Sequence, residues 1–230
     1  MTLDDMKALL AGRLGQRSDI DNMIYSEIRQ AQRVLEKTPP YPWFLMSQQN
    51  TEALAGEQWL QTPADFIEMA DYIVFICKAT ADTKYYAQPF KVYGGYQEHI
   101  QTMGRDARGR PRNFNLQSTN QAMIQFYPTP DISYTVQFFY YRRDTELSGP
   151  ASTNIWSVKG EDILIAEAGW HVARNIRDTQ RASEFGQDRA EARRRIAQET
   201  TSRLESMRRA IIGSGEDALL GQAAREDVFS

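Results

Sequence analysis

The chain has 230 residues, of which 41% are hydrophobic and 25% charged, and its formal net charge is −3. These values are ordinary for a globular protein, and a chain of this length can bury a core without disulfides or a structural metal. The negative charge argues against a protein that wraps nucleic acid over its whole surface. The single cysteine, Cys77, excludes an intrachain disulfide framework and a metal site built from several cysteines.

The sequence shows no targeting or membrane signal. Its N-terminus opens with acidic residues and lacks the apolar core of a signal peptide. The longest apolar run, residues 73–77, is far shorter than the roughly 20 residues that span a bilayer. We therefore expect a protein of a reducing, aqueous compartment without a membrane partner.

A short helix is predicted at the N-terminus. Thr2 and Asp5 have the spacing of a capping box, and Gly15 can end the helix. The apolar stripe at helical spacing consists of Leu3, Met6, Leu9, Leu10 and Leu14.

A longer amphipathic helix is predicted next. Ser18 and Asp21 repeat the capping signal, and Pro39 with Pro40 ends the pattern. Its stripe consists of Ile20, Ile24, Ile28, Ala31 and Leu35.

The middle of the chain, residues 41–154, is predicted to be a β-rich insertion. Helical periodicity fades there, and proline, glycine and aromatic residues interrupt it. We expect a turn at residues 62–66 that leads into a short helical piece ending at Met69, and an exposed basic loop at residues 104–112. The strand candidates are residues 43–46, 72–78, 113–117, 122–127 and 134–141.

Residues 123–147 form the most informative part of the chain. Two runs of aromatic and β-branched residues flank a Pro-Thr-Pro-Asp turn, which predicts a strand pair. Alternate residues of the second run share one face, which we predict to be core: Tyr134, Val136, Phe138 and Tyr140. Phe139 and Tyr141 lie on the other face, which we expect to contact another subunit.

Helices return after a linker at residues 148–154. We predict a helix at residues 161–178 and a long one at residues 182–212. The fold class is therefore α+β, mainly α. The helices of residues 1–40 and 155–213 are expected to form a bundle, with the β-rich insertion between them and residues 214–230 as an extended C-terminal arm.

The sequence offers no catalytic constellation. Its histidines are His99 and His171, and it contains no nucleophile elbow, phosphate loop or zinc-protease motif. Acidic pairs such as Glu161 and Asp162 stand at predicted helix starts, where they complement the helix dipole. We predict that the protein is not an enzyme and uses no cofactor or metal; a hydrolase of unrecognised type is disfavoured.

Two segments are rich in arginine. The long helix carries Arg189, Arg193, Arg194, Arg195, Arg203, Arg208 and Arg209. Acidic residues alternate with them, which favours a solvated helix with i, i+4 ion pairs over a phosphate-binding face. The predicted loop carries Arg105, Arg108, Arg110 and Arg112 against Asp106 alone, and it could meet phosphates, an acidic partner surface or only solvent. DNA binding through either segment is the alternative function.

The order of these segments resembles the head-to-tail adaptor proteins of tailed bacteriophages, also called connector or neck proteins. The matching residues are 63–66, 124–131, 134–136 and 139–141. In layout the resemblance covers most of the chain, although residues 78–112 do not map on the family pattern, and we interpret them as an insertion that meets the next tail component.

The resemblance implies a structural protein of the virion neck, assembled in the host cytoplasm. It implies a ring, usually of twelve copies, that docks on the portal protein and meets a tail or nozzle protein on its far face. The genome DNA would pass through the lumen without sequence-specific binding. The C-terminal arm would reach the portal, which makes Val228 and Phe229 candidate contact residues, and ring closure would use two different faces of each subunit.

Overall fold

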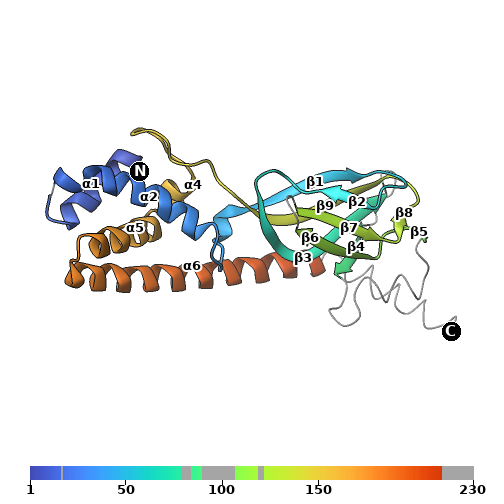
Figure 1. Ribbon diagram of the computed structural model, residues 1–230. Coiled ribbons are helices and arrows are strands. Elements are labelled where there is room, and N and C mark those ends of the chain that lie inside the picture. Colours follow the sequence, from blue (N-terminus) through green and yellow to red (C-terminus); the bar gives the residue numbers. More distant parts are fainter. Residues whose placement is uncertain (17, 79–83, 90–106, 119–121, 214–230) are drawn as a thin grey trace. The chain divides into compact units, whose positions relative to one another are not determined.

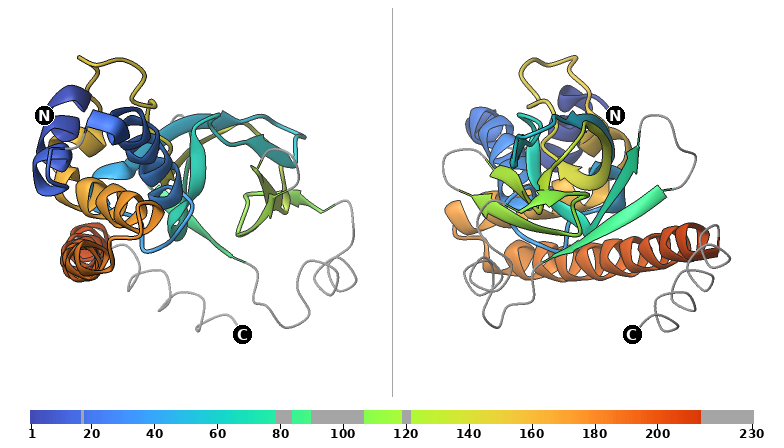
Figure 2. Two further views of the ribbon diagram at one scale, coloured as in Figure 1. Left: turned by 60° about the vertical axis from the view of Figure 1, so that its left-hand side comes forward. Right: turned by 90° about the vertical axis from the view of Figure 1, so that its right-hand side faces the viewer.

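The structure of the chain, a computed structural model, describes residues 1–16, 18–78, 84–89, 107–118 and 122–213. The chain divides into two compact units, Met1–Phe44 with Glu146–Ser230 and Leu45–Thr145. The first unit is built from helices and the second from strands, which confirms the α+β class (Figures 1 and 2). No helix in the described ranges is long and apolar enough to cross a membrane.

The first helix of the helical unit, α1 (Leu3–Arg13), begins at the predicted capping box. The Thr2 side chain accepts a hydrogen bond from the Asp5 amide, and the Asp5 carboxylate accepts one from the Thr2 amide. Gly15 follows the helix with a φ of 88°, a conformation that glycine adopts without strain. Leu9 departs from the predicted stripe because its side chain is 45% exposed.

The second helix, α2 (Asp21–Leu35), starts differently from the prediction. A 3-10 turn (Ser18–Ile20) occupies the expected cap position, so the helix is capped at Ile20 without a side-chain hydrogen bond. The prediction that Ser18 and Asp21 cap this helix is therefore wrong. The predicted stripe is buried, as shown by Ile20, Ile24, Ile28, Ala31 and Leu35.

The C-terminal helices of this unit are α4 (Ile155–Lys159), α5 (Glu161–Asn175) and α6 (Thr179–Gly213). Helix α5 contacts α1 and α2 on one side and α6 on the other (Figure 1). This central position explains why every residue from Ile163 to Gly169 is buried. Phe185 of α6 packs so closely on Gly169 that a Cβ atom there would overlap the Phe185 ring.

The strand unit contains a sheet in the order β1-β9-β3-β4-β6-β7-β2. Its strands are β1 (Met46–Ala53), β2 (Trp59–Gln61), β3 (Phe66–Lys78), β4 (Lys84–Pro89), β6 (Asn113–Ser118), β7 (Ala122–Tyr127) and β9 (Tyr134–Arg142). Neighbours are antiparallel except β4 and β6. A separate parallel pair joins β5 (Arg108–Gly109) to β8 (Thr129–Pro130).

Several local predictions in this unit are wrong. Residues 43–45 form a 3-10 turn (Trp43–Leu45) rather than a strand. The turn after Pro63 is present, since the Phe66 amide donates to the Pro63 carbonyl oxygen. However, the expected helical piece is the beginning of β3, whose Phe66 pairs with Arg142 of β9, and this tertiary pairing overrides the local pattern. Strand β4 was not predicted, and β5 lies within the expected basic loop.

The predicted pairing of the two aromatic runs is also wrong. Both runs are strands, but β7 pairs with β6 and β2, whereas β9 pairs with β1 and β3. The segment between them is not a tight turn because its backbone has other partners. The Thr129 amide donates to the Ala107 carbonyl, and the Pro130 carbonyl accepts from the Gly56 amide.

The inward faces of β7 and β9 nevertheless share one core. Ile124 and Phe126 of β7 belong to the same buried cluster as Val136 and Phe138 of β9. Three strands separate β7 from β9 in the sheet, so the sheet curls strongly around this cluster. The predicted core face of β9, namely Tyr134, Val136, Phe138 and Tyr140, is confirmed.

Candidate interaction surface

The α5–α6 interface is organised around the carboxylate of Glu167, which is only 2% exposed. Arg193 Nη2 donates to Glu167 Oε2 at 3.0 Å, and Arg189 Nε lies 3.3 Å from the same oxygen. His171 Nε2 lies 3.7 Å from the other oxygen. Arg189 and Arg193 of α6 thus pair with the buried carboxylate of α5 and compensate its negative charge.

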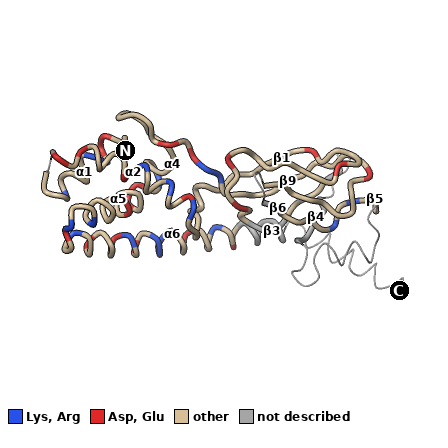
Figure 3. The backbone as a smooth tube through the Cα atoms, viewed as in Figure 1, with Lys and Arg blue, Asp and Glu red and all other residues tan. Residues whose placement is uncertain are grey.

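Two further arginines of α6 contact other elements of the helical unit. Arg195 forms an ion pair with Asp162 of α5. The guanidinium of Arg203 lies 3.6 Å from the ring centroid of Trp43, whose Nε1 donates to Glu199 at 3.1 Å. Arg194 is exposed. Charges of both signs alternate along α6 (Figure 3).

This arrangement corrects the prediction that the arginines mainly form i, i+4 pairs along their own helix. For Arg189, Arg193 and Arg195, the acidic partners are on α5. The side chains of Arg208 and Arg209 lie outside the described residues. Arginines already paired with carboxylates are poor phosphate ligands, so the described part of α6 does not present the stripe that DNA binding requires.

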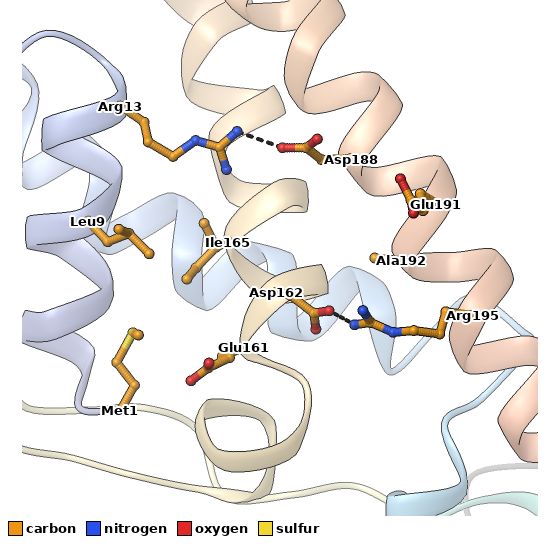
Figure 4. Close-up of a pocket in the computed structure, with 10 residues that line it drawn as sticks. All are labelled: Met1, Leu9, Arg13, Glu161, Asp162, Ile165, Asp188, Glu191, Ala192 and Arg195. Atoms are coloured by element: carbon orange, nitrogen blue, oxygen red, sulfur yellow. Dashed lines mark hydrogen bonds and ion pairs between the residues drawn. The ribbon is translucent and has the colours of Figure 1, made fainter.

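A hollow of about 300 Å³ lies between α1, α5 and α6. Figure 4 shows Leu9 and Met1 on one side of it, Ile165 of α5 behind, and residues of α6 on the other side. We call it the acidic hollow, and its lining consists of Met1, Leu9, Arg13, Glu161, Asp162, Ile165, Asp188, Glu191, Ala192 and Arg195.

The charges of the acidic hollow are only partly balanced. Arg13 Nη2 donates to Asp188 Oδ2 at 2.5 Å, and Arg195 pairs with Asp162 (Figure 4). Within the described ranges, Glu161 and Glu191 form no ion pair. The hollow also contains the Met1 ammonium group, which donates to the Ser157 carbonyl oxygen at 3.1 Å. It therefore combines two paired carboxylates, two carboxylates without an ion pair, this cation and an apolar wall that includes the exposed Leu9.

The residues that were predicted from the sequence to contact partners differ in their exposure. Phe139 is half-buried on β9 opposite Gln48, and Tyr141 is only 6% exposed, which leaves it little surface to offer a partner. Arg108 and Arg112 are exposed and Arg110 is half-buried. The remaining candidates, Arg105, Val228 and Phe229, lie outside the described residues.

Sequence reasoning missed the acidic hollow, although two signals were present. Leu9 completes the α1 stripe next to Leu10, but a helix buries only one face, and Leu9 falls outside it. The acidic pair of Glu161 and Asp162 was assigned to the helix dipole alone. Only the packing of α1 beside α5 and α6 shows that both signals line one hollow.

The described residues hold no site of catalytic or metal chemistry that we can identify. Among them, no group of three or more histidine, cysteine, aspartate or glutamate side chains could hold a metal ion. His171 is engaged with Glu167, and His99 lies outside the described ranges.

Comparison with known proteins gives a match over most of the chain. Residues 1–212 match the family model described as SU10 adaptor protein. No curated protein matches the chain.

Proposed function

The chain belongs to the SU10 adaptor protein family, and on that premise we propose that it is a structural head-to-tail adaptor that forms a ring on the portal of a tailed phage. The ring joins the capsid to the tail and lets the genome pass. The observation that carries this proposal is the family match, because it spans both units of the chain.

The helical unit has features that suit an assembly protein. Its α5–α6 contact is fixed by the buried carboxylate of Glu167 and by the close approach of Phe185 to Gly169. Such a unit can present contact surfaces in a constant geometry without an active site. A phage adaptor also implies a location in the virion, which we specify as the neck between capsid and tail.

We assign three kinds of partner to the ring. Neighbouring copies, twelve in all, meet through two different faces of each subunit. The portal protein receives the C-terminal arm, residues 214–230, through Val228 and Phe229. A tail or nozzle protein binds the far face. The contacts we propose for these interfaces are Phe139 and the arginines at 105, 108, 110 and 112, whereas Tyr141 is too deeply buried to be proposed as one.

The alternative function, DNA binding, has no observation in its favour. The described arginines of α6 are largely engaged by carboxylates or a tryptophan ring, as Arg193 and Arg203 illustrate. Genome DNA passing through the ring therefore meets it without sequence-specific binding.

The proposal is tested by mixing the chain with its purified cognate portal protein and imaging the mixture by negative-stain electron microscopy. We expect an additional ring on one face of the portal. A chain ending at residue 213 provides the control for the arm and is expected to bind more weakly. Portal particles that remain unchanged at saturating concentrations of the full chain would overturn the proposal.

A further inference from the structure

We propose that the outer edge of strand β1 is the surface at which one copy of the chain pairs with the next. The inference rests on the proposed function and names one contact of its ring. The edge accepts an extended segment of the neighbouring copy, residues 107–112, as an added strand. Three features carry the proposal: an open edge, the lack of the usual protection, and opposite charges on the two segments.

Strand β1 is an outer strand of the sheet (Figure 1). All its residues, from Met46 to Ala53, are in register with β9 on one side. On the other side, no backbone hydrogen bond reaches β1 from any residue that the structure describes. A row of free backbone donors and acceptors of this length is a template for a further strand. The chemistry of the edge therefore defines its occupant as an extended polypeptide.

The edge of β1 lacks the features that keep an exposed strand single. Many proteins blunt such edges with short strands, lysine, proline or a bulge. Strand β1 contains no lysine, arginine or proline, and its register with β9 runs without a shift. At the opposite edge of the sheet, β2 has only three residues, and Pro63 follows shortly after it. The β2 edge is thus protected in the usual way, whereas the β1 edge is suited to pairing.

The charge around β1 selects the partner segment. Residues 38–77, which include β1 and β2, contain five acidic residues and neither lysine nor arginine. Glu52 on β1 and Glu57 in the loop that follows are exposed, and neither has an ion pair within the described part of the chain. Opposite charges on neighbouring strands stabilise a sheet and like charges destabilise it. The edge therefore favours an added strand that is basic.

The same chain offers a segment of that kind. Strand β5, which lies within residues 107–112, pairs with β8 as its one strand partner among the described residues. Arg108 and Arg112 are exposed and have no ion pair there. The acidic edge and the arginine segment are different surfaces, so their pairing is heterologous, which is the kind of contact that closes a ring. Because each copy carries one of each, every β1 edge in the ring finds one partner.

The test reverses the charge of each surface separately in the full-length chain. The edge variant is Glu52→Lys with Glu57→Lys, and the arginine variant is Arg108→Glu with Arg112→Glu. Rings on the purified cognate portal protein are counted by negative-stain electron microscopy over a range of chain concentrations. The salt concentration is about 50 mM, at which charge pairs near a surface are screened weakly.

The control reverses two exposed acidic residues of the helical unit, Glu184→Lys with Glu191→Lys, and thus changes the net charge by as much as the edge variant does. It should form rings as the wild type does. Circular dichroism and thermal unfolding should show all variants folded, because the replaced side chains are exposed.

Each of the two surface variants alone should need roughly tenfold more chain to form rings, because like charges then face each other at every contact. An equal mixture of the two should form rings as readily as the wild type. Copies that alternate around a ring of twelve bring a reversed edge to a reversed arginine segment and an unchanged edge to an unchanged one. A general loss of stability cannot produce this restoration.

Hydrogen exchange measures the backbone pairing itself. The amides of residues 46–53 that point away from β9 should exchange more slowly in the wild-type ring than in the free chain, because the added strand accepts their hydrogen bonds. Contact through side chains alone would leave their exchange unchanged, which would overturn the strand pairing.

The remaining outcomes separate this inference from the proposed function. Wild-type rings, together with unimpaired rings of either surface variant, overturn the β1 pairing alone. Surface variants that fail singly and also in mixture overturn it, as does a control that loses its rings. Slow exchange of the β1 amides on the portal when the arginine variant forms no ring identifies the portal as the occupant and overturns it too. Wild-type chain that forms no ring on the portal overturns the proposed function, and the β1 pairing with it.

Discussion

Arg193 of α6 donates a hydrogen bond of 3.0 Å to the buried Glu167 of α5. This contact changes the meaning of the arginine-rich helix. In the sequence the helix could be read as a phosphate-binding stripe, whereas in the fold its arginines hold two helices together.

Replacement of Glu167 by alanine is expected to destabilise the helical unit. The change removes the only carboxylate shown to face Arg189 and Arg193 among the described residues. Loss of one partner of a buried ion pair costs about 3–5 kcal/mol, and because both arginines are partly exposed to water we expect about 1–3 kcal/mol. The free energy of unfolding in urea measures the effect. Glu191→Gln, on an exposed and unpaired carboxylate, should change it by less than about 0.5 kcal/mol, and an equal loss in both variants would contradict the assignment.

Replacement of Gly169 by alanine is expected to loosen the α5–α6 contact. A methyl group there overlaps the ring of Phe185, and overpacking of this kind costs about 1–3 kcal/mol, which outweighs the gain in helix propensity of up to about 1 kcal/mol. Gly186→Ala is the matched control because its nearest neighbour, Trp170, lies at ordinary contact distance, 3.7 Å. The midpoint temperature of thermal unfolding should be lower than that of the wild type for Gly169→Ala and higher for Gly186→Ala. Stabilisation of both would show that α5 and α6 are not so closely packed.

Replacement of Phe138 by alanine is expected to destabilise the strand unit, since its side chain is fully buried in the core cluster. Truncation of a buried phenylalanine costs about 3–5 kcal/mol. The adjacent Phe139 is half-buried on the other face of β9. Its replacement by alanine should lower the free energy of unfolding clearly less. Chemical denaturation distinguishes the two, and comparable losses would contradict the assignment of the faces. Phe138→Asp should prevent folding and hence assembly.

Stability at high pH should depend on Tyr140. Burial raises the pKa of the Tyr140 hydroxyl, helped by the charge of Asp65 and the hydrogen bond to it, and a hydrogen bond with Ser47 offsets part of this effect. In the unfolded chain the hydroxyl ionises near pH 10. Above that pH the unfolded state loses the proton first, so the stability contributed by Tyr140 is complete below about pH 10 and declines as the pH rises through the raised pKa. Tyr140→Phe should cost about 0.5–1.5 kcal/mol at pH 7, and that difference should shrink as the pH rises above about 10. Urea unfolding at several pH values measures it, and a constant difference would argue against the raised pKa.

Affinity for duplex DNA should be low. Non-specific DNA-binding proteins bind with dissociation constants of about 10⁻⁴–10⁻⁶ M and lose affinity steeply with salt. We expect weaker binding than this at physiological salt by fluorescence anisotropy, and no change when Arg105, Arg108, Arg110 and Arg112 are replaced by alanine. Tight, salt-dependent binding that these replacements abolish would restore DNA binding as a function.

The sequence alone determined features that depend on neighbouring residues. The capping box of Thr2 and Asp5, the buried stripe of α2 and the inward face of β9 were predicted because helices and strands repeat over a few residues, so burial follows the pattern directly. The resemblance to adaptor proteins also arose at this level, and the family match supports it.

Only the tertiary structure decided which elements meet. The sequence predicted that β7 pairs with β9 because they are adjacent in the chain. In the structure β9 pairs with the distant β1 and β3, and β7 lies between its other chain neighbour, β6, and the distant β2. The sequence could not show that the arginines of α6 would find Glu167, since one arginine pattern suits solvent, phosphate or a neighbouring helix equally well. Nor could it show that Leu9 would stay exposed in the same hollow as Glu161, because that position depends on how α1 packs against α5 and α6.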